Sequence, residues 1–274
     1  MTSSSALVTG ATSGLGLGLA EALTERGWSI VAHGRPGRRR SPPPCGGARW
    51  AWAVLGELAQ VAGLAERLAH DPPHVIVNNA GVGYGPPGQT RQCSQDGIEL
   101  RFAVNYLAPV LLTELLRARG ARPPQLVLNI GSTNHAGFDL NDVALTRGYS
   151  GAQAYRQSKC ALAAYSVDLA SDLAWGPAQP TVYLHPGSRM NTKIVTDSGV
   201  TPTGDLAAGV AAALEVILGD PSRYRGPGVI RDPHGPVAPA PEVNHPPFRA
   251  QLADYTCELL APFLPATSRT GATP

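Results

Sequence analysis

The chain has 274 residues, of which 43% are hydrophobic and 15% charged, so one large domain or two small ones could form a substantial core. A formal net charge of +2 gives no electrostatic reason to expect a nucleic-acid partner. The four cysteines show no paired spacing and the seven histidines no metal-ligand pattern, which argues for reduced thiols and against a metal site. We see no secretory leader and no apolar run of about 20 residues, so we expect a cytoplasmic protein without a membrane span.

Short apolar runs alternate with longer helical patterns along most of the chain. The expected strands are residues 6–9, 29–32, 50–55, 74–77, 126–130 and 181–184. The expected helices are residues 15–26, 98–116, 149–173 and 206–218, the second of them kinked at Pro109. This alternation predicts an α/β fold, in which helices cover both faces of a doubly wound, mostly parallel sheet.

Four segments do not fit the alternation. Prolines and glycines make any helix within residues 35–49 short or absent, and residues 83–88 read as a Gly/Pro-rich loop. Residues 225–247 contain many prolines and are expected to form an extended surface segment. A disordered tail is expected at residues 266–274, which leaves a single domain at residues 1–265.

A glycine-rich turn follows the first strand and opens the first helix. Its sequence is Thr9-Gly10-Ala11-Thr12-Ser13-Gly14-Leu15-Gly16. The glycines allow a tight turn and a close backbone approach, and the free N–H groups of the helix N-terminus favour a pyrophosphate. A purely structural turn is the alternative, but the position between a strand and a helix favours dinucleotide binding.

The end of the second strand bears on the choice of cofactor. An acidic residue there would bind the ribose 2′-hydroxyl of NAD(H), whereas this chain has His33-Gly34-Arg35 and further arginines at positions 38–40. A guanidinium group suits a 2′-phosphate, so Arg35 favours NADP(H) over NAD(H). The alternative is that these arginines are solvated loop charges.

Tyr155 and Lys159 lie four residues apart at the beginning of a predicted helix, so their side chains share one face. A nearby ammonium group favours the phenolate, and a tyrosine of lowered pKa could act as a general acid and base. Such a pair also occurs by chance on many solvated helices, so its meaning depends on the rest of the chain.

Together these motifs resemble the short-chain dehydrogenase/reductase family. The matching motifs run in family order: residues 9–16, Asn78-Asn79-Ala80-Gly81, Asn105, Ser132, and Tyr155 with Lys159. Residues 96–107, residues 147–159 and the long spacing from Ser132 to Tyr155 are similar to the branch that contains retinol dehydrogenases and light-dependent protochlorophyllide reductase. The resemblance implies a single-domain Rossmann-type fold, and hydride transfer between NADP(H) and a carbonyl or alcohol of a small molecule.

The resemblance also implies four catalytic roles. Tyr155 would exchange a proton with the substrate oxygen, and Lys159 would lower its pKa and hold the nicotinamide ribose. Ser132 would orient and polarise the carbonyl. Asn105 would bind a water in a proton relay to Lys159, although an asparagine there could equally bond a neighbouring backbone group.

Further cofactor contacts are implied beyond the glycine turn. They are the adenosine-ribose contacts Asn79, Ala80 and Gly81, the adenine contacts Glu57 and Leu58, and the nicotinamide contacts Pro186, Gly187 and Thr192. The chain departs from the family in having glutamate rather than aspartate at position 57, and its threonine at 192 lies one position late. The proline-rich residues 36–49 put the packing on the adenosine side in doubt.

Residues 133–150 and 187–205 are expected to shape the substrate pocket, where His135, Phe138 and Met190 read as packing residues rather than catalytic ones. Two other functions stay open: an epimerase or dehydratase on the same scaffold, or a non-catalytic NADP(H)-binding regulator. Relatives form homodimers or homotetramers through the helices matching residues 98–116 and 149–173, and the branch also includes monomers.

Overall fold

The computed structural model describes residues 4–37, 46–171, 178–226 and 229–265. Within these ranges, eight strands form one sheet in the order β3-β2-β1-β4-β5-β6-β7-β8. Neighbouring strands run parallel except β7 and β8, which form an antiparallel hairpin. The strands are β1 Ser5–Val8, β2 Ser29–Gly34, β3 Arg49–Trp52, β4 Val75–Asn78, β5 Leu126–Ile130, β6 Thr181–Leu184, β7 Ile230–Asp232 and β8 Gly235–Pro236.

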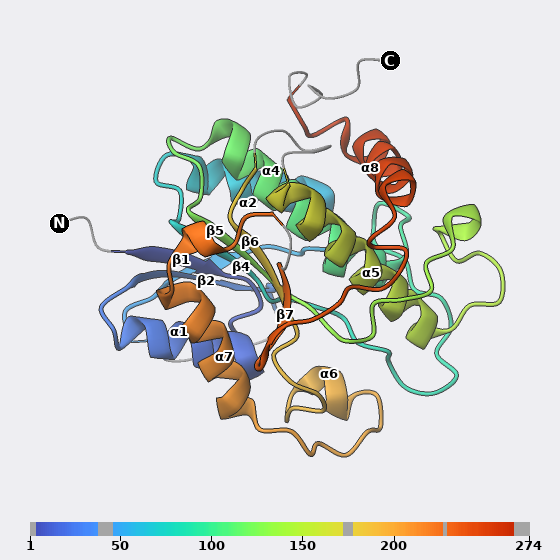
Figure 1. Ribbon diagram of the computed structural model, residues 1–274, viewed down its shortest axis with the longest axis horizontal. Helices are drawn as coiled ribbons and strands as arrows, with labels where there is room; N and C mark the ends of the chain where they lie inside the picture. The colour runs from blue at the N-terminus through green and yellow to red at the C-terminus, as the bar shows by residue number, and fades with distance from the viewer. Residues whose placement is uncertain (1–3, 38–45, 172–177, 227–228, 266–274) are drawn as a thin grey trace.

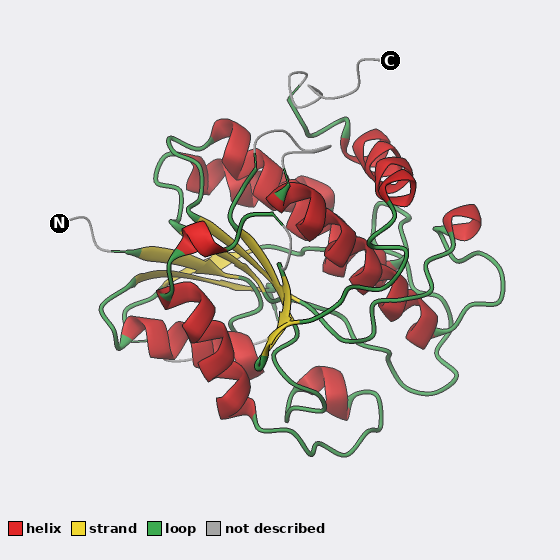
Figure 2. Cartoon of the chain, in the orientation of Figure 1, coloured by secondary structure: helices red, strands yellow, loops and turns green. Residues whose placement is uncertain are grey.

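Helices cover both faces of the sheet, as Figures 1 and 2 show. On one face α1 (Gly14–Thr24) packs against α7 (Leu206–Leu218). On the other face α2 (Leu58–Ala69) packs against α4 (Ala108–Arg119), beside α5 (Gly151–Ala170). A further helix, α8 (Pro246–Leu260), packs against α5. This arrangement confirms the predicted doubly wound α/β fold.

The central strands are apolar throughout because both of their faces are buried. In β1, Leu7 belongs to the core beneath α2, α4 and α5, whereas Ala6 and Val8 belong to the core beneath α1 and α7. All three side chains are fully buried. Two separate apolar cores therefore fix the register of each inner strand.

The topology reverses at β1, whose two neighbours are β2 and β4. In open parallel sheets, a ligand binds in the crevice beyond the carboxyl ends of the strands at such a point. The segments after β1, β2, β4, β5 and β6 begin at this edge, and most of the long loops lie beyond it (Figure 2). The predicted site residues of these segments are thus brought to one edge.

Two of the longer helices, α2 and α8, were not predicted from the sequence. Helix α2 repeats apolar residues with helical spacing (Leu58, Val61, Leu64, Ala65 and Leu68), and all of them are buried. Helix α8 starts at Pro246 and Pro247, with the His245 side chain accepting a hydrogen bond from the Phe248 N–H. Proline is favoured in the first turn of a helix, so these prolines begin a helix instead of ending a loop.

The predicted helix at residues 98–116 is interrupted. It begins as α3 (Leu100–Phe102), widens into one π turn, η1 (Ala103–Leu107), and continues as α4. Pro109 lies in the first turn of α4, directly after the π turn. Proline has no N–H to complete a regular α-helical bond to the residue four positions earlier, and a π turn is one way to absorb that loss.

The prediction that residues 225–247 form an extended surface segment was wrong in its surface placement. Part of it is β7 and β8, and Val229, Ile230 and Val243 are buried in the core. Three short helices complete the described fold: η2 (Leu140–Asp142), α6 (Lys193–Thr196) and η3 (Pro221–Arg223). The predicted tail at 266–274 and most of the proline-rich stretch, residues 38–45, lie outside the described residues.

Candidate active site

The glycine turn has the shape of an anion cradle. Gly10 and Gly14 have φ angles of +69° and +57°, in the left-handed region that favours glycine. A Cβ atom at Gly16 would lie 2.4 Å from Nδ2 of Asn79 and 2.5 Å from the Gly10 carbonyl oxygen, so a side chain cannot fit there. Ser13, the N-cap of α1, makes no side-chain capping bond, so the cap leaves the first N–H groups of the helix to a ligand.

The remaining predicted residues of the turn support it in different ways. Leu15 is buried in the core, so only its backbone could face a ligand. Thr12 packs beside Gly34 at the end of β2. Thr9 is buried, and its hydroxyl accepts hydrogen bonds from the N–H groups of Asn79 at 2.9 Å and Ala80 at 3.0 Å. Thr9 therefore ties the turn to the end of β4.

Asn79 holds the turn from the opposite side. Its side-chain amide donates to the Thr9 carbonyl at 2.8 Å. The adjacent Gly81 lies beside the Asn105 side chain, because a Cβ atom there would be 3.3 Å from Oδ1 of Asn105. The predicted motif at residues 78–81 thus connects the glycine turn with the π turn.

His33 is a further support of the glycine turn that the sequence reading did not identify. Its Nδ1 accepts a hydrogen bond from the Gly10 N–H at 3.2 Å, so Nε2 carries the proton and donates to the Ala53 carbonyl at 3.1 Å. Burial lowers the pKa of His33 to about 4, which keeps the ring neutral. The sequence does carry a signal for this role: a histidine one residue before the end of a buried strand that runs beside the glycine turn.

The adenosine side agrees with the prediction only in part. Arg35 is exposed and directly follows β2, at the edge where a ribose phosphate would lie. The Leu58 N–H, however, donates to the Asp96 carboxylate at 2.9 Å, so an adenine contact through this group requires that bond to open. Glu57 precedes α2 and accepts a hydrogen bond from Gln60 at 2.6 Å.

Residues after β6 approach the same turn. Pro186 is buried, and Gly187 has a φ angle of +136°. Thr192 lies over the glycine turn, since a Cβ atom at Gly14 would be 3.2 Å from its methyl group. Its hydroxyl hydrogen bond to the Met190 carbonyl is long, at 3.4 Å. The expected contact of Thr192 with the nicotinamide stays a prediction.

Tyr155, Lys159 and Ser132 meet where α5 crosses the end of β5. Lys159 is buried, and its ammonium group donates to the Ile130 carbonyl at 2.7 Å and lies 5.9 Å from the centre of the Tyr155 ring. The Ser132 side chain lies near enough to the Tyr155 hydroxyl to lower its pKa. Its Oγ also accepts the Asn134 N–H at 3.1 Å. Because that lone pair is occupied, the serine hydroxyl hydrogen is free to point toward Tyr155.

Burial, rather than the ammonium group, dominates the protonation of this pair. It raises the pKa of Tyr155 to about 12, although the neighbouring Ser132 opposes the rise. Burial also lowers the pKa of Lys159 to about 8. The expectation that Lys159 lowers the pKa of Tyr155 stays a prediction, since burial and the neighbouring Ser132 and Tyr84 are the influences on Tyr155 in this arrangement.

Asn105 occupies the π turn with its side chain fully engaged. Its Oδ1 accepts the Val82 N–H at 2.7 Å, and its Nδ2 donates to the Val82 carbonyl at 3.0 Å and to the Ser158 hydroxyl at 2.9 Å. The Asn105 side chain thus bonds neighbouring backbone groups, which was the alternative to a role in a water relay. The expected water relay stays a prediction.

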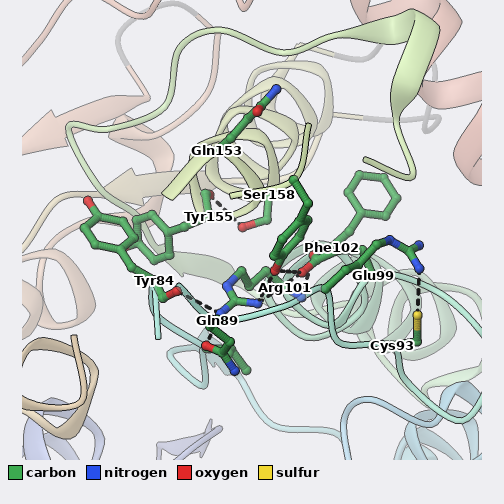
Figure 3. A network of polar contacts seen from close by, with 12 residues as sticks. Tyr84, Gln89, Cys93, Glu99, Arg101, Phe102, Gln153, Tyr155 and Ser158 are labelled. Carbon is green, nitrogen blue, oxygen red and sulfur yellow. Dashed lines mark hydrogen bonds and ion pairs between the residues drawn. The ribbon is translucent and has the colours of Figure 1, made fainter. Parts of the chain in front are cut away.

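A buried ion pair fixes one wall of the site (Figure 3). Arg101 and Glu99 are fully buried and lie 3.2 Å apart. Arg101 also donates to the Gly83 carbonyl at 2.7 Å, the Tyr84 carbonyl at 2.9 Å and the Tyr149 hydroxyl at 2.7 Å. These bonds anchor the glycine- and proline-rich loop to the beginning of α5.

The anchored loop places Tyr84 against Tyr155. Their rings are perpendicular, with centres 4.7 Å apart, and Figure 3 shows the two side by side. The Tyr84 hydroxyl accepts a hydrogen bond from the Asn134 side chain at 2.6 Å. Tyr84 therefore forms a wall of the space in front of Tyr155.

A hollow of about 620 Å³ opens beside this wall. Its lining comes from residues 84–91 and 149–152 together with Ser198. Tyr149, Ser150 and Ser198 belong to the segments expected to shape a substrate pocket, whereas residues 84–91 do not. Within the described ranges, the structure holds no cluster of histidine, cysteine or acidic residues that could bind a metal ion, and no helix long and apolar enough to cross a membrane.

Comparison with known proteins gives one consistent family. A family model described as short chain dehydrogenase matches residues 4–177. An uncharacterized oxidoreductase of Emericella nidulans is 31% identical over 87% of this chain and 89% of its own length. Human retinol dehydrogenase 13 is 31% identical over 66% of this chain and 57% of its own. Mouse polyprenol dehydrogenase is 35% identical, but the match spans only 53% of that protein.

Solved structures share the fold. A protein from Mycobacterium paratuberculosis superposes with a TM-score of 0.70 at 24% identity, over 93% of both chains. A short-chain dehydrogenase/reductase from Burkholderia multivorans, solved with bound NADP, has a TM-score of 0.62 at 23% identity, over 85% of this chain and 97% of its own.

Proposed function

The chain belongs to the short-chain dehydrogenase/reductase family and is an oxidoreductase, and from this premise we propose that it interconverts a carbonyl and an alcohol on a small organic substrate with NADP(H) and Tyr155 as the acid–base residue. One observation carries the proposal. Tyr155 and a buried Lys159 lie one turn apart on α5, with Ser132 near enough to Tyr155 to lower its pKa, at the strand edge that also holds the glycine turn.

The residues at this edge fit a nicotinamide dinucleotide. The glycine turn and the N-terminus of α1 would hold the pyrophosphate, and Arg35 would pair with a 2′-phosphate. Lys159 and Tyr155 would face the nicotinamide ribose, with Gly187 and Thr192 on the other side of the groove. When bound, the nicotinamide supplies or accepts the hydride.

Tyr155 is protonated at neutral pH, and burial raises its pKa further, from 10 to about 12. It can therefore give a proton to an alkoxide that develops beside it during carbonyl reduction. The Oγ of Ser132 already accepts a hydrogen bond from the Asn134 N–H. Its own hydroxyl hydrogen can therefore be donated to the alkoxide oxygen and stabilise the developing negative charge. The protonated Tyr155 is the form that carbonyl reduction requires.

Proton resupply is the proposed task of Lys159 and Asn105. Burial brings the pKa of Lys159 to about 8, so the group can both hold and release a proton near neutral pH. Pro109 lacks the N–H that would bond the Asn105 carbonyl in a regular helix, which favours a relay water at that oxygen.

The test is a search for turnover with NADPH on a panel of aldehydes and ketones. Because two relatives are named for retinol and polyprenol, the panel includes the corresponding aldehydes. We expect at least one carbonyl to be reduced with one NADPH consumed for each alcohol formed. A product formed without net NADPH consumption would indicate an epimerase or dehydratase instead. Tight NADPH binding without turnover on the panel would indicate a regulator.

A further inference from the structure

Ser132 is held by its backbone as well as by its side chain. The Tyr183 hydroxyl accepts a hydrogen bond from the Ser132 N–H and donates one to the Ser132 carbonyl, both at 2.9 Å. Tyr183 is a fully buried residue of β6, paired with Asn129 of β5. One tyrosine hydroxyl from the neighbouring strand therefore fixes both polar backbone groups of a single residue.

Gly131 leaves the space that Tyr183 requires. A Cβ atom at Gly131 would lie 2.2 Å from Cε1 and 2.3 Å from Cζ of the Tyr183 ring. The Gly131 N–H donates to the Leu184 carbonyl at 2.7 Å, so the sheet itself prevents the backbone from moving away. The glycine before Ser132 is thus explained by the tyrosine that reaches beneath it.

His135 holds the same carbonyl from a second direction. Its Nδ1 lies 2.7 Å from the Ser132 carbonyl oxygen, and its Nε2 accepts the Ala240 N–H at 3.2 Å. Because an amide N–H must donate to Nε2, Nδ1 carries the proton and donates to Ser132. The His135 ring also packs edge-on against Tyr183, with ring centres 5.5 Å apart. Both lone pairs of the Ser132 carbonyl therefore have a donor.

We infer that Tyr183 and His135 are positioning residues that fix Ser132, so that its hydroxyl is already aimed at the reacting oxygen before a substrate binds. A donor held in place needs no reorganisation when charge develops, and a displacement of about 1 Å in such a group can cost about 100-fold in rate. The inference rests on the proposed function, because it assigns these residues a role only through Ser132.

The same arrangement connects Ser132 to the segment after β8. His135 is bonded to Ala240, and the Glu242 carboxylate accepts hydrogen bonds from the N–H groups of Gly137 and Phe138. The loop after Ser132 is therefore fastened to residues more than a hundred positions later in the chain. This explains why part of the 225–247 segment is built into the interior.

The experiment compares Tyr183→Phe with Tyr165→Phe in the full chain. Both variants remove a buried tyrosine hydroxyl, but Tyr165 bonds Glu114 at 2.6 Å and lies almost three turns beyond Tyr155 on α5. We expect Tyr183→Phe to lower kcat about 10- to 100-fold, with the NADPH dissociation constant unchanged. We also expect a larger kinetic isotope effect with deuterated NADPH, since hydride transfer becomes slower. Tyr165→Phe should change none of these quantities, even where it lowers the melting temperature equally.

A double variant separates positioning from general loosening of the fold. In a Ser132→Ala background, Tyr183→Phe should cause no further loss of kcat, because no hydroxyl remains to be aimed. A further loss there, or wild-type kcat and isotope effect in Tyr183→Phe alone, would overturn the inference. If Tyr183→Phe does not fold, His135→Phe takes its place, with a smaller expected loss because Tyr183 still holds the carbonyl. Full activity of Ser132→Ala would instead overturn the proposed role of Ser132.

Discussion

Burial fixes the protonation of His33, and through it the shape of the glycine turn. The folded-state pKa of about 4 lies below the ordinary value of 6.5. Between these values the unfolded chain binds more protons than the folded chain, so the stabilisation is complete above pH 6.5 and is lost as the pH falls toward 4. From pH 7 to pH 5 we expect this residue to lower the free energy of unfolding by about 2 kcal/mol.

Urea unfolding of the wild type and of His33→Gln at both pH values measures this effect. Glutamine stays neutral throughout, so the variant should lose less stability than the wild type between pH 7 and pH 5. Equal losses in the two proteins would show that His33 is not held neutral by its contacts with Gly10 and Ala53.

Arg35 is the residue on which cofactor choice depends most directly. It is exposed at the end of β2, and no acidic residue follows the strand at positions 35–37. We expect Arg35→Ser to weaken NADPH binding about 10- to 100-fold, the range of a charge-assisted hydrogen bond, and to leave NADH binding unchanged. Fluorescence titration with both nucleotides provides the comparison. An equal loss of affinity for NADPH and NADH would mean that Arg35 does not bind the 2′-phosphate.

At the scale of elements, the π turn is held to its neighbours by one amide side chain. Asn105 bonds both polar groups of Val82 and the hydroxyl of Ser158 on α5. Asn105→Ala would leave these buried groups without partners, and we expect it to lower the free energy of unfolding by about 2–4 kcal/mol. Ser158→Ala removes only one of the bonds and should cost about 1 kcal/mol. Similar losses for the two variants, measured by urea unfolding, would contradict this account.

Elements with a strong local signal could be predicted, and those defined by distant contacts could not. Strands β1, β4, β5 and β6 were recognised because each is a short, continuous apolar run between turns. Helix α2 has apolar residues at helical spacing, which is a local signal, whereas the prolines at the start of α8 also fit the expected extended segment. The site residues followed from motifs, whereas Tyr183, His135 and Arg101 acquire their roles only from partners far away in the sequence.

On the scale of the whole molecule, α8 packs against α5 and covers part of its surface. Arg249 of α8 pairs with buried Asp168 of α5 at 2.6 Å, and Thr256 bonds the Tyr106 hydroxyl at 2.7 Å. Arg249→Met would leave Asp168 buried without its charge partner, at a cost of about 3–5 kcal/mol. We expect earlier proteolysis within residues 246–265 and a larger particle in light scattering, because the apolar side of α5 becomes exposed. A variant that resists proteolysis as well as the wild type, and has the same particle size in light scattering, would contradict this role of α8.

The most direct test of the central claim is the turnover of Tyr155→Phe on the carbonyl that the wild type reduces best. The substitution removes the hydroxyl that is proposed to give the proton, so we expect kcat to fall by about 10²- to 10⁴-fold. NADPH binding, measured by titration, should persist, because the glycine turn and Arg35 are untouched. Tyr155→Phe with wild-type kcat would contradict the assignment of Tyr155 as the acid–base residue.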